Sequence, residues 1–155
     1  MKTRTMRTIP IRLHDIIVRS LSLILSGLLL YTATKKLMDI EAFSAHLELL
    51  PYAGETAADI LTIGVMLVEY ALGFIILYRP QDARGYLMIV SLMLTYTGYI
   101  YYILHHAPIL PCSCQGAFKS LSWEVHYVIN VVVAVLSAVA WKLVKQQRKH
   151  KQETL

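Results

Sequence analysis

Charged residues are scarce in this chain: Asp, Glu, Lys and Arg make up 16% of its 155 residues, whereas a soluble domain carries about 25%. Apolar residues make up 56%, and they gather in long runs. The runs lack the period-two alternation of membrane β-barrel strands, which excludes that class. The chain also lacks internal repeats, low-complexity tracts and flexible linkers. We therefore expect a membrane protein whose spans are helices.

Four apolar runs have the length of a membrane span. They cover residues 16–34, 57–78, 85–104 and 125–144, each close to the roughly 20 residues that cross about 30 Å of hydrocarbon. A soluble bundle of four buried helices is the alternative, and the regular spacing of the runs disfavours it. The first run could also be a signal peptide, but it ends in Lys35-Lys36 without a clear cleavage site. We predict an all-α, up-and-down bundle of four transmembrane helices, forming a single domain over residues 1–155.

Basic residues predict the orientation of this bundle. Twelve of the 15 Lys and Arg residues lie in three places. These are the start of the first span, the segment between the second and third spans, and the end of the fourth span with the tail over residues 145–155. The positive-inside rule then places both termini in the cytoplasm. The segments 35–56 and 105–124 would face outward. The net charge of +5 is typical of a protein whose basic cytoplasmic segments set its topology and attract anionic lipid head groups. It does not indicate nucleic-acid binding.

Both cysteines of the chain lie in one motif, Pro111-Cys112-Ser113-Cys114-Gln115-Gly116, in the second outward segment. Disulfides form and persist on the outer side of a bacterial cytoplasmic membrane. A disulfide between residues this close closes a very small ring, which contributes little stability and stores strain. Strained, exposed disulfides are typical of labile or catalytic pairs. The motif therefore favours a redox centre over a structural crosslink.

A metal site is the main alternative for these cysteines. Two thiolates can bind Cu(I) or Zn²⁺ together with imidazoles. His105 and His106 precede Cys112 and Cys114 closely, and His126 follows them. The spacing of these residues does not exclude a metal site. It also does not exclude that the motif has no chemical role.

Several polar side chains are expected inside the bundle rather than in lipid. His126 and Asn130 are spaced i, i+4 and share a helix face. His126 could exchange protons with a cysteine, because imidazole titrates near neutrality. Glu69 lies near the middle of the second span, and Arg19 is a candidate partner for it. All of these could equally be structural pairs that hold helices together.

Three further motifs accompany the two cysteines before the last span. They are Lys35-Lys36-Leu37-Met38-Asp39 followed by Phe43, Glu69 with Gly73, and Leu121-Ser122-Trp123-Glu124 followed by His126 and Asn130. By these motifs and their order, the chain resembles the methylamine-utilisation MauE family, a branch of the DoxX-like membrane proteins. The match extends from about Ile16 to Val144.

This resemblance implies a redox-associated protein of the bacterial inner membrane. Relatives of the MauE type support maturation of the disulfide-rich subunit of methylamine dehydrogenase, and DoxX-type relatives belong to quinone-linked oxidoreductases. By resemblance, Cys112 and Cys114 are the redox pair, and a thioredoxin-like or disulfide-containing exported protein is the partner. A membrane quinone is a candidate electron acceptor. A non-catalytic assembly subunit remains an alternative to a thiol–disulfide oxidoreductase.

Overall fold

A computed structural model describes residues 11–48, 54–106 and 122–153 of the chain. They form five helices: α1 (Ile11–Met38), α2 (Ile40–Leu47), α3 (Glu55–Tyr78), α4 (Ala83–His106) and α5 (Trp123–Glu153). Within these ranges there is no strand. The four spans expected from the sequence each lie within one of the long helices. The expectation of an all-helical bundle is therefore confirmed.

Four of these helices, α1, α3, α4 and α5, are long and apolar enough to cross a membrane. The shortest has 24 residues, which gives about 36 Å at 1.5 Å per residue. Large apolar side chains are exposed on all four, including Ile16 on α1, Leu67 on α3, Leu94 on α4 and Val128 on α5. Such extensive apolar exposure is unfavourable in water but suits contact with lipid. The chain is a multi-pass membrane protein.

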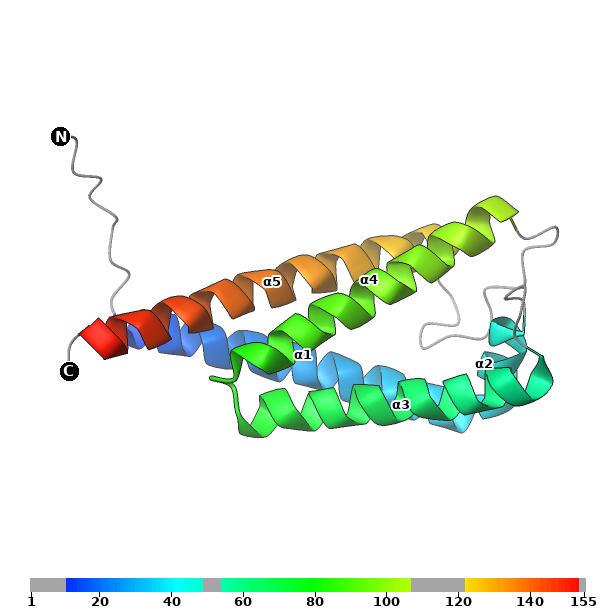
Figure 1. Cartoon of the computed structure of the whole chain (residues 1–155), viewed down its shortest axis with the longest axis horizontal. Coiled ribbons are helices and arrows are strands. Elements are labelled where there is room, and N and C mark those ends of the chain that lie inside the picture. The colour runs from blue at the N-terminus through cyan, green and yellow to red at the C-terminus, as the bar shows by residue number, and fades with distance from the viewer. Residues whose placement is uncertain (1–10, 49–53, 107–121, 154–155) are drawn as a thin grey trace.

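The four long helices run up and down (Figure 1). Gln147 Nε2 near the end of α5 donates to Asp15 Oδ1 near the start of α1, over 2.8 Å. Arg148 Nη2 donates to the carbonyl of Gln81, in the α3–α4 turn, over 2.7 Å. We call this end of the bundle, defined by Asp15, Gln81, Gln147 and Arg148, the turn end.

The bundle consists of two tightly packed helix pairs, α1 with α3 and α4 with α5. Ser26 Oγ on α1 donates to the carbonyl of Gly73 on α3 over 2.9 Å. A Cβ at Gly73 would lie only 2.9 Å from Leu30 Cδ2, so glycine permits this close approach of the two helices. The buried apolar core lies between the pairs and includes Leu25, Leu29, Leu72, Ile76, Tyr86, Ile89, Met93 and Val133.

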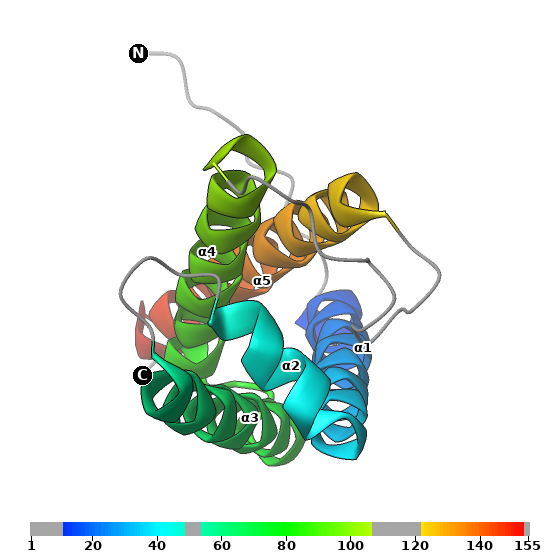
Figure 2. The same ribbon diagram turned by 90° about the vertical axis from the view of Figure 1, so that its right-hand side faces the viewer.

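The short helix α2 lies across the end opposite the turn end (Figure 2). The sequence analysis treated residues 35–56 as a connecting segment and did not identify this helix. Ser44 Oγ on α2 donates to Asp59 Oδ1 on α3 over 2.6 Å, and Tyr99 OH on α4 donates to the carbonyl of His46 over 2.7 Å. These bonds fix α2 against α3 and α4. We call this end, which holds α2, His106 and Trp123, the cavity end.

Candidate functional site

A cavity of about 470 Å³ opens inside the cavity end of the bundle. All five helices contribute residues to its wall. Most of the wall is apolar, with Leu28, Leu29, Val65 and Met93 among its residues. Its size lies in the range of small-molecule sites, about 300–1,000 Å³. The polar or ionisable side chains in the wall are Thr32, Lys36, His46, Glu69, Thr95, Tyr96, Tyr99, Trp123, His126 and Asn130.

Three of these side chains form a buried polar cluster of Lys36, Glu69 and Tyr96. Lys36 Nζ donates to Glu69 Oε1 over 2.5 Å, and Tyr96 OH donates to the same oxygen over 2.6 Å. Lys36 Nζ also lies 3.1 Å from Tyr96 OH. The Lys36 ammonium sits 5.0 Å from the centre of the Phe43 ring, which adds a cation–π contact. The cluster thus joins α1, α2, α3 and α4 at one point.

Glu69 is only 1% exposed, so its carboxylate depends on these donors. A charge taken out of water destabilises a protein by several kcal/mol unless it is paired and hydrogen-bonded. The second carboxylate oxygen of Glu69, Oε2, is buried and has no hydrogen-bond partner among the described residues. A buried acceptor without a donor is unfavourable. The cavity is therefore chemically suited to a molecule that brings a hydrogen-bond donor to an otherwise apolar wall.

The cation that pairs with Glu69 is Lys36, not Arg19. Arg19 is exposed on α1, and 17 residues separate it from Lys36, which is about 25 Å along a helix. The prediction that Arg19 lies inside the bundle as a partner of Glu69 is therefore wrong. The long Lys36 side chain instead reaches inward from the last turn of α1.

The rings of His46, Trp123 and His126 lie near one another in the cavity wall. The His46 and Trp123 ring centroids are 5.7 Å apart, and those of Trp123 and His126 are 6.3 Å apart. His126 Nδ1 lies 3.2 Å from the carbonyl of Ser122, directly before α5. One turn further along α5, Asn130 lines the same cavity. His126 and Asn130 therefore share an inward face, as their spacing predicts.

His105 and His106 lie elsewhere, exposed at the end of α4. The His105 ring stacks on Tyr101, with ring centroids 4.2 Å apart, and the His106 ring stacks on Tyr102 at 4.8 Å. In the described ranges, no group of three or more His, Cys, Asp or Glu side chains could hold a metal ion. A metal site would thus depend on Cys112 and Cys114, which lie outside the described residues.

The cysteine segment connects two described helices at the cavity end. Cys112 and Cys114 belong to residues 107–121, which the structure does not describe. The segment begins after His106, the last residue of α4, and α5 begins at Trp123. Trp123, the first residue of α5, lines the cavity, so the chain that carries the motif leads directly into the site that holds His126.

Residues 14–143 match the family described as methylamine utilisation protein MauE. The chain belongs to the MauE family. No curated protein and no solved structure matches the chain at a significant level. The MauE match covers all five helices in whole or in large part, so it includes every wall of the cavity.

In this MauE-family chain, the separate sequence motifs that carried the resemblance meet at the cavity. Lys36 and Phe43 come from the first motif, Glu69 from the second, and Trp123, His126 and Asn130 from the third. Sequence reasoning missed Tyr96 and His46 as parts of the site. Tyr96 and Tyr99 both line the cavity.

Proposed function

We propose that this protein performs thiol–disulfide exchange through Cys112 and Cys114, on the outer face of the bacterial cytoplasmic membrane. The exchange supports maturation of an exported protein such as a methylamine dehydrogenase subunit. The observation that carries the proposal is the position of the Cys-x-Cys motif in the chain, between the end of α4 and the start of α5, two helices that both line a mostly apolar cavity with a buried polar cluster. MauE family membership supports a role in methylamine utilisation.

The orientation in this proposal follows from charge. Arg79, Arg84, Lys145, Arg148 and Lys149 lie at or near the turn end of the bundle. Cytoplasmic segments carry an excess of Lys and Arg, so the turn end and both termini face the cytoplasm. The cavity end then faces the oxidising compartment in which disulfides persist.

The exchange itself conserves atoms and electrons. A partner thiolate attacks one sulfur of the Cys112–Cys114 disulfide, which forms a mixed disulfide and releases the other cysteine as a thiolate. The second partner thiol then attacks the mixed disulfide. The partner leaves with a disulfide, and Cys112 and Cys114 become a dithiol after gaining two electrons and two protons. His126, four residues into α5, is the proposed proton acceptor and donor for the cysteines.

The cavity fits the head group of a membrane quinone as the electron acceptor. Its wall is mostly apolar, and the same wall includes Lys36 and Asn130, which carry N–H donors, and Glu69, whose Oε2 is a buried acceptor. A bound quinone would accept two electrons and two protons from the dithiol. The chain's contribution is to hold donors for a carbonyl oxygen and an acceptor for a hydroxyl in one site, so that both redox forms find hydrogen-bond partners.

Trapping of the mixed disulfide tests the exchange directly. A chain with only one of its two cysteines cannot resolve the intermediate, so we expect Cys112→Ser or Cys114→Ser to accumulate a covalent adduct with a thioredoxin-like or disulfide-containing exported protein. The adduct should disappear on reduction and be absent from the double variant Cys112→Ser/Cys114→Ser. Absence of an adduct from both single variants, in cells that express the protein normally, would reject the exchange role.

A further inference from the structure

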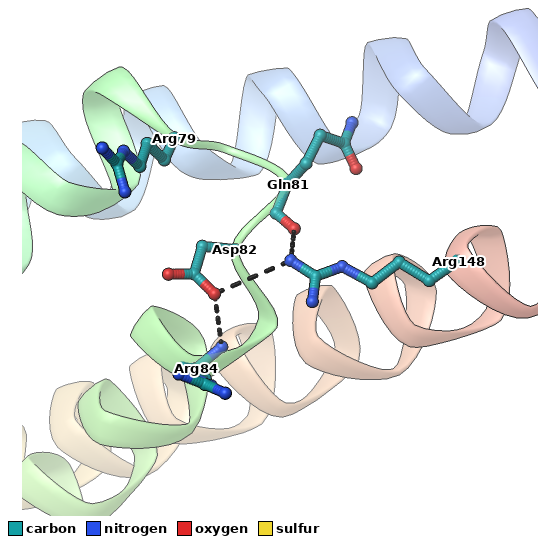
Figure 3. Close-up of a pocket in the computed structure, with 5 residues that line it drawn as sticks. All are labelled: Arg79, Gln81, Asp82, Arg84 and Arg148. Carbon is teal, nitrogen blue, oxygen red and sulfur yellow. Dashed lines mark hydrogen bonds and ion pairs between the residues drawn. The ribbon is translucent and has the colours of Figure 1, made fainter.

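The turn end of the bundle contains a second pocket, of about 380 Å³. Five residues line it, and Figure 3 shows their side chains: Arg79, Gln81, Asp82, Arg84 and Arg148. They come from the α3–α4 turn, the first turn of α4 and the end of α5. In contrast to the cavity at the other end, no apolar side chain contributes to this wall.

Hydrogen bonds hold this pocket in shape. Arg148 Nη2 donates to the carbonyl of Gln81 over 2.7 Å and lies 3.7 Å from Asp82 Oδ1. The same Asp82 oxygen accepts the backbone N–H of Arg84 over 3.1 Å. Gln81 Nε2 contacts Asp15 Oδ1 on α1 at 3.4 Å. The turn is thus tied to both α1 and α5.

Positive charge in the pocket exceeds negative charge. The residues that line it carry three guanidinium groups and one carboxylate, that of Asp82. Among the described residues, the side chains of Arg79 and Arg84 have no ion-pair partner. The guanidinium group is planar and presents paired N–H donors that match the oxygens of a phosphate. The pocket therefore has two cations available for a phosphate group.

The depth of the pocket favours a lipid as the source of that phosphate. The membrane-spanning segments end at Tyr78 and Lys149, and the next begins at Ala83, so the three arginines lie at the level of the lipid head groups. In the last turns of α3, directly before Arg79, the rings of Phe74 and Tyr78 stack with their centroids 6.3 Å apart. These two residues are 46% and 77% exposed. They offer an apolar surface for acyl chains next to the cationic pocket.

We propose that this pocket binds the phosphate of an anionic membrane lipid, with Arg79 and Arg84 as its phosphate ligands and Arg148 as the residue that holds the turn in place. Basic pockets between transmembrane helices commonly bind anionic head groups. This site shares no residue with the cavity, and it does not depend on the exchange reaction.

Native mass spectrometry of the purified full-length protein tests the proposal, with phosphatidylglycerol and phosphatidylcholine supplied at equal concentrations. We expect retention of phosphatidylglycerol in preference to phosphatidylcholine. The double variant Arg79→Gln/Arg84→Gln should lower phosphatidylglycerol affinity about tenfold or more, because each basic residue contributes appreciably to binding an anionic lipid. Arg148 stays unchanged in this variant, so the α3–α4 turn remains tied to α5.

The matched control is Arg19→Gln/Lys142→Gln, which removes two exposed cations outside the pocket. It should keep the parent's lipid preference. Equal retention of both lipids by the parent protein, or equal losses in both double variants, would overturn the proposal. Displacement of the lipid by millimolar inorganic phosphate, with phosphate bound in its place, would also overturn it by identifying a site for free anions.

Discussion

The two ends of the bundle each contain an ion pair, and the two pairs differ in burial. Lys36 and Glu69 at the cavity end have side chains 11% and 1% exposed, whereas those of Arg148 and Asp82 at the turn end are 58% and 30% exposed. Exposed pairs contribute roughly 0–1 kcal/mol and are easily rearranged. A buried pair is costly to form and becomes strongly destabilising when one partner is removed. The cavity end therefore holds the polar groups whose loss the protein tolerates least.

Removal of Lys36 should have the largest effect on stability. Lys36→Met leaves the buried Glu69 carboxylate without its cation, and we expect a loss of about 3–5 kcal/mol in the free energy of unfolding. Unfolding by sodium dodecyl sulfate in mixed micelles, followed by circular dichroism, measures it. The double variant Lys36→Met/Glu69→Met should recover much of the loss. If Lys36→Met alone unfolds like the parent protein, the pair does not stabilise the bundle.

Gly73→Ala should have a smaller but clear effect. The added Cβ would lie 2.9 Å from Leu30 Cδ2 and 3.0 Å from Leu30 Cγ, so the Leu30 side chain must move and the contact between α1 and α3 must repack, at a cost of about 1–3 kcal/mol. Gly64→Ala on the same helix is the control, because a Cβ there meets no atom within 4 Å. Equal stability of both variants in the same micelle assay would contradict the close packing of α1 against α3.

Tyr96→Phe tests the polar cluster without removal of a charge. It deletes the hydrogen bond from Tyr96 OH to Glu69 Oε1, and bonds to charged groups contribute about 1.5–3 kcal/mol. We expect a loss at the lower end of that range, because Lys36 still pairs with Glu69. Tyr101→Phe, which alters an exposed tyrosine on the same helix, should leave the unfolding curve unchanged. A similar shift in both variants would show that the cluster has no special role.

Asp82→Asn should have the smallest effect. It removes the carboxylate of the exposed pair, whose contribution is roughly 0–1 kcal/mol and falls as salt screens it. Unfolding curves of this variant and the parent should converge between low and high salt. A loss as large as that of Lys36→Met would contradict the contrast between the two ends.

The fold could be predicted from the sequence because membrane spans obey a simple length and hydropathy rule. The short helix α2 could not be, since eight residues carry no span signal and its position depends on contacts such as Ser44 with Asp59. His126 and Asn130 were placed on one inward face because their spacing fixes this. The pairing of Lys36 with Glu69 required knowledge of the relative depth of α1 and α3, and sequence periodicity does not contain that information.

Tyr96 illustrates the same limit at the site. Tyrosine is enriched at membrane interfaces, so four tyrosines near one end of a span indicate a belt. In the structure, Tyr101 is exposed, whereas Tyr96 lies inside and donates to Glu69. Which tyrosine faces inward depends on the rotation of α4 about its axis, and packing against α5 and α3 sets that rotation.

The accessibility and redox state of Cys112 and Cys114 in intact cells test the central claim most directly. A membrane-impermeant maleimide should label neither cysteine before reduction and both after brief treatment with dithiothreitol, without cell lysis. That result requires a disulfide on the outer face. Labelling that appears only after lysis would place the pair in the cytoplasm, and full labelling without a reductant would show free thiols. Either outcome would contradict an outward-facing exchange centre.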